Sequence, residues 1–327
     1  MTEQPWSLGR AIRRSRRPPT PDAWVVGVDI GGTSTSAVLL DAVGVVRARQ
    51  RATTPAGAGA DGILAVVADL VHTVDPDRWA EQVGVGATGV VDPADGTVVA
   101  ATASMPGWSG TNLPSRLAPV LRRQVVAVND VHAFVVGEAR AGAAVGAQHV
   151  LGVTVGTGVG GAVLIEGRVL GGRKGAAGHV GHVPVPAAVG LRCPCGAVGH
   201  VEAVAAAPAL MAAYRARVAG RQTSGVGDLE QVARLAEEGD RDAIEVLAEG
   251  GRSLGEALAG VVAVVSPDVV VVGGGVMDAG VLVLDPLRAA LAVHAHPVVA
   301  DVPVRSSLLG ADAVAVGAAL HARGVLS

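Results

Sequence analysis

Three apolar segments of this chain each run into a glycine-rich turn. The pairs are Trp24–Ile30 with Gly31-Gly32-Thr33, Val150–Val155 with Gly156-Thr157-Gly158-Val159-Gly160-Gly161, and Asp268–Val272 with Gly273-Gly274-Gly275. Successive N–H groups in such turns form anion-binding concavities, and glycine lets a phosphate approach with no Cβ in the way. One such turn alone could be only a tight turn, but three at the ends of apolar strands indicate phosphate binding. The predicted phosphate-binding residues are Gly31, Gly32, Thr33, Gly156, Thr157, Gly158, Gly160, Gly161, Gly273 and Gly274.

Two common nucleotide motifs do not fit these turns. Gly156, Gly158 and Gly161 match G-x-G-x-x-G, but the hairpin-like segment Ala162–Leu170 follows where a dinucleotide site needs a helix. A P-loop needs a lysine followed by Ser or Thr, whereas the single lysine of this chain, Lys174, precedes a glycine. Phosphate is therefore expected to be held through backbone amides.

The pair Asn129-Asp130 ends a predicted strand, Val125–Val128, and begins a predicted helix, Val131–Ala141. Both residue types favour the N-cap position of a helix, so a purely structural role stays open. A carboxylate there could also accept the proton of a hydroxyl group that attacks a phosphoryl group in line.

Composition limits the classes of partner. The 327 residues are 50% apolar, which excludes disorder over most of the chain and favours two domains. A formal charge of −3 gives no general attraction to nucleic acid or to an anionic membrane, so small molecules are the expected ligands. The charge-free stretch Ala141–Ile165 holds Gln148, His149 and many glycines and does not fit a transmembrane helix. Two cysteines make no disulfide framework, and the N-terminus lacks a signal-peptide core, so we expect a cytoplasmic protein.

The pattern of elements repeats along the chain. Residues 1–22 are rich in Arg and Pro and are expected to be a disordered basic tail. Each half then opens with strand, Gly/Thr turn and strand, which suggests a duplicated architecture. Further strands are expected at Ser36–Asp41, Gly44–Arg51, Gln82–Ala87, Ala162–Glu166 and Arg168–Leu170. Helices are expected at Ile63–Val74, Glu202–Val218, Leu229–Glu238, Asp240–Val265 and Asp312–Ala322.

Taken together, the motifs resemble the ROK family of sugar kinases and related regulators. They are Asp29-Ile30-Gly31-Gly32-Thr33, the turn Val155–Gly161, Gly178-His179-Val180-Gly181-His182, Cys193-Pro194-Cys195-Gly196 and Glu202, in the family's order from about residue 24 to the end. The resemblance implies an α/β fold of the actin-like ATPase (ribonuclease H-like) type, with two α/β domains and an interdomain cleft. We expect the N-terminal domain at 23–128, joined by the C-terminal helix 311–327, and the C-terminal domain at 129–310. The resemblance also suggests a homodimer.

The same resemblance implies roles for individual residues. Asp130 would be the catalytic base, Asn129 a sugar ligand, and Asp29 an outer-shell anchor for the Mg²⁺ that accompanies ATP. His182 and Glu202 resemble sugar-contacting residues, although Glu202 could instead be only a favourable carboxylate at a helix N-terminus. Ser104 stands where the family often has a sugar-binding Asn, and its shorter side chain leaves that contact open.

His182, Cys193, Cys195 and His200 have the spacing of the family's structural zinc site within the loop 179–202. His200 stands where the third cysteine is usual, and imidazole is a competent substitute, so a His₂Cys₂ zinc site is expected. Two free thiols in a loop are the alternative.

The sugar is suggested by His179, where glucokinase-like members usually have Glu. With His179 and the segment Ala87-Thr88-Gly89-Val90, the sequence resembles the N-acetylmannosamine kinases of sialic acid breakdown. A histidine can bond to hydroxyls near C1 and C2 while tolerating an axial acetamido group. Glucose and N-acetylglucosamine are alternatives, and His179 could be only a solvent-facing loop residue.

Two other functional classes are alternatives to a kinase. A transcriptional regulator of this family carries a helix-turn-helix domain ahead of the first glycine turn, and 22 residues are too few for three helices. A non-catalytic sugar-binding protein is the other alternative. Asp130 and the intact glycine turns favour catalysis.

Overall fold

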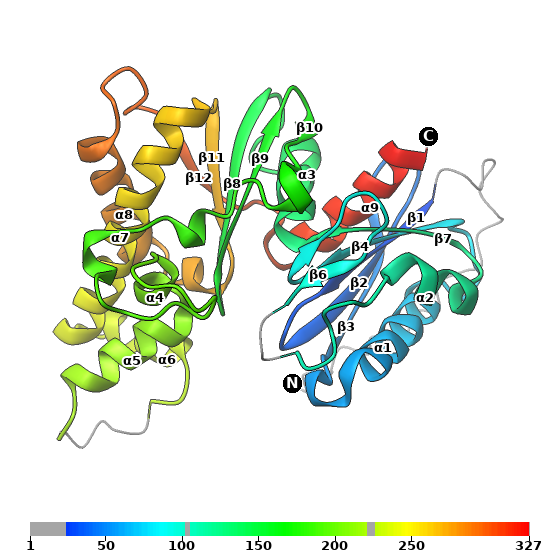
Figure 1. Ribbon diagram of the computed structural model, residues 1–327, viewed down its shortest axis with the longest axis horizontal. Helices are drawn as coiled ribbons and strands as arrows, with labels where there is room; N and C mark the ends of the chain where they lie inside the picture. Colours follow the sequence, from blue (N-terminus) through cyan, green and yellow to red (C-terminus); the bar gives the residue numbers. More distant parts are fainter. Residues whose placement is uncertain (1–23, 102–104, 221–225, 327) are drawn as a thin grey trace, which may run out of the picture.

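The computed structural model describes residues 24–101, 105–220 and 226–326, and its core is two five-stranded sheets (Figure 1). The first sheet holds β1 (Val25–Ile30), β2 (Ser34–Leu40), β3 (Val46–Thr53), β4 (Gln82–Ala87) and β7 (Gln124–Asn129). The second holds β8 (His149–Val155), β9 (Val159–Ile165), β10 (Arg168–Val169), β11 (Val269–Gly273) and β12 (Val304–Ser306). The short strands β5 (Val90–Val91) and β6 (Val98–Ala100) pair separately.

The two sheets have the same topology. Their strand orders are β3-β2-β1-β4-β7 and β10-β9-β8-β11-β12. In each sheet, the first three strands in sequence form an antiparallel meander. The fourth strand then pairs in parallel with the first, and the fifth pairs in parallel with the fourth. The duplication predicted from the repeated strand and turn pattern is therefore confirmed.

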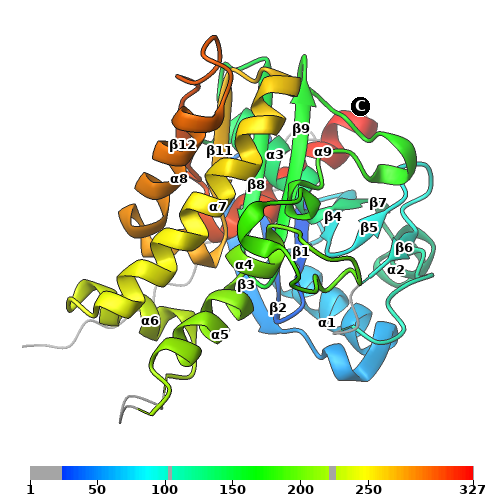
Figure 2. The same ribbon diagram turned by 60° about the vertical axis from the view of Figure 1, so that its left-hand side comes forward.

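Helices form three layers around these sheets. They are α1 (Gly59–Val74), α2 (Leu113–Leu121), α3 (Asp130–Ala141), α4 (Glu202–Ala205), α5 (Ala207–Arg217), α6 (Leu229–Glu237), α7 (Arg241–Val265), α8 (Val281–His294) and α9 (Ala313–Leu326). Figure 1 shows α1 and α2 outside the first sheet, α4 to α8 outside the second, and α3 with α9 between the two sheets. In Figure 2 the long helix α7 crosses in front of β8 and β11.

The closing helix α9 lies unusually close to the first sheet. A Cβ added to Gly27 on β1 would lie 1.8 Å from the carbonyl oxygen of Ala315, and one added to Gly84 on β4 would lie 1.9 Å from that of Ala318. Only glycine in these two strands lets the helix backbone rest directly on the sheet. The helix α9 therefore packs directly on β1 and β4 of the first sheet.

The helix predicted over Glu202–Val218 is wrong as one element. It is two helices, α4 and α5, because Ala206 has an extended backbone (φ −71°, ψ 153°). The N–H of Ala207 donates to Gly156 in the second glycine turn (2.8 Å) instead of continuing the helix, and Pro208 has no N–H to donate. The break therefore joins this segment to the predicted phosphate site.

The helix α1 with its preceding turn, Ala56–Val74, is the one helix of the described ranges that is long and apolar enough to span a bilayer. That is weak evidence, since a core helix passes the same test. Ile63, Val67 and Val71 are fully buried in the core beside the first sheet, which is the behaviour of a core helix.

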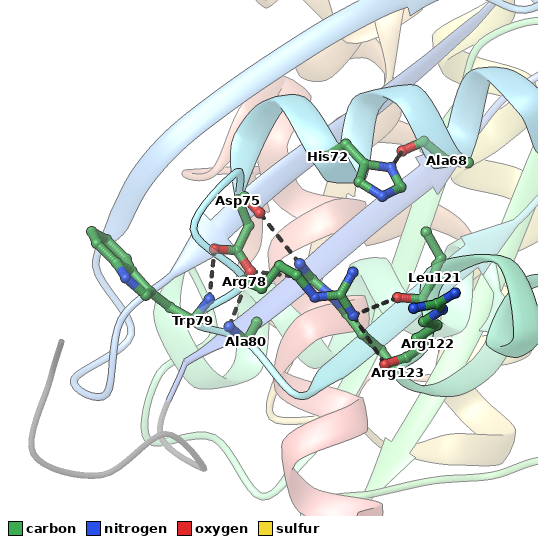
Figure 3. A network of polar contacts seen from close by, with 9 residues as sticks. All are labelled: Ala68, His72, Asp75, Arg78, Trp79, Ala80, Leu121, Arg122 and Arg123. Atoms are coloured by element: carbon green, nitrogen blue, oxygen red, sulfur yellow. Dashed lines mark hydrogen bonds and ion pairs between the residues drawn. The ribbon is translucent and has the colours of Figure 1, made fainter.

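A buried ion pair between Arg123 and Asp75 lies near the amino-terminal end of β7, in the first sheet (Figure 3). Arg123 Nη1 lies 2.7 Å from Asp75 Oδ2, and both side chains are at most 2% exposed. The Asp75 carboxylate also accepts from the N–H groups of Trp79 (2.9 Å) and Ala80 (3.0 Å), while Arg78 donates to the Leu121 carbonyl (2.9 Å). The end of α1 is thus tied to the α2–β7 connection.

Removing one partner of this pair is expected to destabilise the protein strongly. Arg123→Met leaves the Asp75 carboxylate buried without its counter-ion and should lower the free energy of unfolding by about 3–5 kcal/mol. The matched change Arg116→Met breaks an exposed pair with Asp61 and should cost about 0–1 kcal/mol. Urea unfolding curves measure both, and equal shifts of the two midpoints would contradict the buried-pair assignment.

Candidate active site

The ends of three strands bring the first glycine turn and the predicted base to one edge of the first sheet. Ile30, Ala87 and Asn129 are aligned across the parallel strands β1, β4 and β7. The residues that follow them are Gly31, Thr88 and Asp130, so the first glycine turn and the predicted base come together at the carboxyl edge. This is where ligands bind in open parallel sheets.

The half-buried Asp130 carboxylate is held at the first turn of α3. Its Oδ1 accepts from the N–H of Val131 and from the Asn129 amide, each at 2.8 Å. Burial raises the pKa of Asp130 to about 6, against the hydrogen bonds from Val131, Asn129 and Thr88 that lower it. A pKa near the operating pH suits a general base.

Asp29 on β1 shares this environment. Burial, and next the charge of Asp130, raise the pKa of Asp29 to about 7, while Arg51 opposes the rise. Because the charge of Asp130 raises the pKa of Asp29, a cation near both carboxyl groups would be favourable. The role of Asp29 beside Mg²⁺ stays a prediction.

Asn129 is the N-cap of α3. Its Oδ1 accepts from the N–H groups of Val131 (3.0 Å) and His132 (3.2 Å), and its Nδ2 donates to the Gly89 carbonyl (2.7 Å) and to Asp130 (2.8 Å). The capping alternative is therefore observed, and the amide has used both of its hydrogens. A sugar contact by Asn129 stays a prediction, and it would have to replace one of these bonds.

The first glycine turn leaves a short stretch of backbone open. Gly31 donates to the Ser34 carbonyl (3.0 Å) and accepts from the Thr54 hydroxyl (2.7 Å), which fixes the turn. Gly32 and Thr33 are exposed, and a Cβ on Gly32 would meet nothing within 4 Å. Their position fits the predicted approach of a phosphate.

The second glycine turn divides into two functional parts. Gly156, Thr157 and Gly158 form the turn itself, in which the Gly156 N–H donates to the Gly158 carbonyl (2.9 Å). Gly160 and Gly161 lie within β9, where added Cβ atoms would come 2.4 Å from Val131 Cγ2 and 2.3 Å from the Gly178 carbonyl oxygen. These two glycines let α3 and the 178–180 segment pack closely, and their contact with ATP stays a prediction.

The third glycine turn lies beside the second. Gly273 ends β11 opposite Thr154 of β8. Gly274 has φ +92°, and a Cβ there would lie 2.5 Å from the Val155 carbonyl oxygen. The carboxyl edge of the second sheet therefore presents two glycine turns side by side.

The four predicted metal ligands come together. One ligand atom from each of His182, Cys193, Cys195 and His200 lies within 4.8 Å of the others. Cys193 Sγ is 3.7 Å from His182 Nδ1, and Cys195 Sγ is 3.3 Å from His200 Nδ1. Tetrahedral zinc holds such S and N ligands about 3.5 Å apart, so the residues fit the ion.

His182 connects this cluster to the predicted sugar loop. Its Nδ1 faces Cys193, which leaves Nε2 for another partner, and its ring stacks with that of His179 at 6.1 Å. Burial, and the neighbouring His200 and His179, lower the pKa of His182 although Glu202 opposes them. The neutral imidazole that results is the form that ligates a metal.

The structure adds two residues that the sequence did not assign. Thr88 follows β4 and hydrogen-bonds to Asp130, a position that the strand-to-turn pattern of Gln82–Ala87 could have indicated. His132 is buried two residues after Asp130 with no partner for Nε2 among the described residues, and burial lowers its pKa to about 4. Ser104 lies outside the described residues.

Comparison with known proteins gives a consistent result. The profile described as ROK family matches residues 25–325. A glucokinase of Thermotoga maritima is 32% identical over 91% of this chain and 97% of its own, and an N-acetylmannosamine kinase of Shigella flexneri is 30% identical over 92% and 98%. The structure resembles the ROK family glucokinase of Streptomyces griseus solved with glucose and AMPPNP, with a TM-score of 0.81, 32% identity and coverage of 92% of this chain and 99% of that one.

Metal content is the first measurable consequence of this geometry. Purified protein should hold one Zn²⁺ per chain, His200→Ala should lose most of it, and His200→Cys should retain it because thiolate also suits zinc. Elemental analysis after dialysis measures the content, with His296→Ala, an exposed histidine elsewhere, as control. Full zinc in a Cys193→Ser/Cys195→Ser double variant would overturn the assignment.

Proposed function

The chain belongs to the ROK family, and we propose that it is an ATP-dependent kinase that phosphorylates the C6 hydroxyl of N-acetylmannosamine. Sugar kinase activity is what the family and the names of its relatives support. The observation that carries the proposal is Asp130, a carboxylate with a pKa of about 6 at the edge that also bears a glycine turn.

In the proposed reaction, the C6 hydroxyl lies against Asp130 and loses its proton to that carboxylate as its oxygen attacks the γ-phosphorus of ATP. The glycine turns donate backbone N–H groups to the phosphate oxygens, which disperses the charge of the transferring group. Mg²⁺, when bound with ATP, neutralises phosphate charge, and Asp29 would anchor its hydration shell. ADP leaves, and Asp130 returns its proton to solvent.

The proposed sugar site uses His179, His182 and Glu202, with Ser104 and Asn129 as further predicted contacts. His179 donates through Nδ1 to the Ala176 carbonyl (2.9 Å), so Nε2 is left to meet a sugar hydroxyl. A compact ring in place of a carboxylate is the feature that favours an N-acetylated sugar. Glucose is the second candidate, because a relative named glucokinase is 32% identical, against 30% for the N-acetylmannosamine kinase.

We further propose that zinc is structural. It would hold His182, Cys193, Cys195 and His200 and thereby fix the 179–202 loop on which the sugar contacts depend. The domain limits at 128 and 310, a homodimer, a cytoplasmic location and the lack of nucleic-acid or membrane partners stay predictions from the sequence.

Substrate choice is tested by a panel of sugars. A coupled ADP-release assay should give the highest kcat/KM with N-acetylmannosamine among N-acetylglucosamine, glucose, mannose and fructose. Asp130→Asn should reduce kcat by about 10²–10⁴ because the base is lost. His179→Glu should shift the preference toward glucose. A wild-type preference for glucose would leave a sugar kinase but refute the assigned sugar, and no turnover on any sugar would refute the kinase.

The pH dependence should report the base. Asp130 must be deprotonated to accept a proton, so kcat/KM should fall about tenfold per pH unit below its pKa of about 6 and level off above it. Phosphorus NMR of the sugar phosphate over pH 5–8, at saturating Mg²⁺, measures the profile without coupling enzymes. A flat profile between pH 5 and 7 would contradict the role of Asp130.

A further inference from the structure

Glu202 contacts two parts of the site that are far apart in sequence. Its Oε2 accepts from the Val159 N–H at 2.8 Å, at the end of the second glycine turn. Its Oε1 lies 3.4 Å from Cys193 Sγ in the metal cluster. The carboxylate therefore stands between the cluster and the turn, in addition to any contact with sugar.

The turn is held at both ends by the same short segment. Glu202, at the start of α4, accepts a hydrogen bond from the Val159 N–H. Ala207, at the start of α5, donates one to the Gly156 carbonyl at 2.8 Å. The peptide between Gly158 and Val159 is also fixed on its other side, because the Gly158 carbonyl accepts from the Gly156 N–H. Its orientation is thus fully determined.

This arrangement decides which amides are left for a ligand. With the N–H groups of Gly156 and Val159 occupied, those of Thr157 and Gly158 have no acceptor within the described part of the chain. A Cβ on Gly158 would lie 2.8 Å from Glu202 Oε2, so a side chain at this position would have to displace the carboxylate. The carboxylate and the turn are packed against each other.

We propose that Glu202 is a positioning residue for the phosphate turn: by fixing the Val159 N–H it orients the free amides of Thr157 and Gly158 toward the nucleotide. This inference rests on the proposed ATP site and adds nucleotide affinity to the sugar contact suggested for Glu202. The useful property is the acceptor oxygen and not the negative charge, since a carboxylate near ATP phosphates repels them.

Nucleotide binding without sugar tests the proposal. In titration calorimetry with AMPPNP and Mg²⁺, Glu202→Ala should raise the Kd about tenfold or more. Without the carboxylate, the amides of Thr157 and Gly158 are no longer oriented, and a hydrogen bond from them to a charged phosphate oxygen is lost. Glu202→Gln keeps an acceptor for Val159 and should bind AMPPNP as well as wild type or more tightly. A Kd unchanged in Glu202→Ala would overturn the proposal, whereas a wild type that binds no AMPPNP would overturn the ATP site itself.

A double-mutant cycle separates this role from loss of fold. Gly158→Ala should weaken AMPPNP binding by displacing the carboxylate, and it should cause little further loss when Glu202 is already alanine. Full additivity of the two changes would contradict the proposal. Glu230→Ala, an exposed glutamate in the first turn of α6, is the matched control and should leave the Kd unchanged. Zinc content and thermal melting confirm that each variant is folded.

Discussion

Parallel pairing of β4 with both β1 and β7 aligns the ends of three strands, and the catalytic proposal depends on that alignment. A slip of one residue would turn Asp29 to the opposite face of the sheet and move Asp130 away from the first glycine turn. Gly27 and Gly84 oppose such a slip, because a valine in either place would collide with the backbone of α9. The register set by these glycines thus places two carboxyl groups close enough to raise the pKa of Asp29.

The helix that begins at Asp130 is also fixed at its other end. Glu138 is fully buried and accepts from the Ser307 hydroxyl (2.5 Å) and from the N–H groups of Ala143 (2.7 Å), Leu308 (3.2 Å) and Leu309 (3.1 Å). These contacts join α3 to the segment that leads from β12 into α9. Asn129 caps one end and Glu138 anchors the other, so Asp130 is carried on an element with little freedom to move.

Local sequence was sufficient for some features and not for others. The strands before the glycine turns and the duplicated order were predictable, because a β-branched run favours a strand and the glycines after it favour a turn. The helix α2 was not predicted. Pro119 inside it argues against a helix, whereas Pro114 in its first turn and the cap by Asn112 are compatible with one. The roles of Gly160 and Gly161 depend on Val131 and Gly178, which are distant in sequence, and spacing alone cannot reveal them. The grouping of His182, Cys193, Cys195 and His200 was predictable because these residues match the zinc motif of the family that the sequence resembles.

The position of α9 has a consequence for how the chain is made. It covers Val25, Val38 and Leu40 on the inner face of the first sheet, yet its residues are synthesised after those of the second sheet. Until those residues leave the ribosome, the N-terminal half has an apolar face with no cover and cannot complete its core. The first sheet is therefore synthesised before the second but can be covered only after the second has been synthesised.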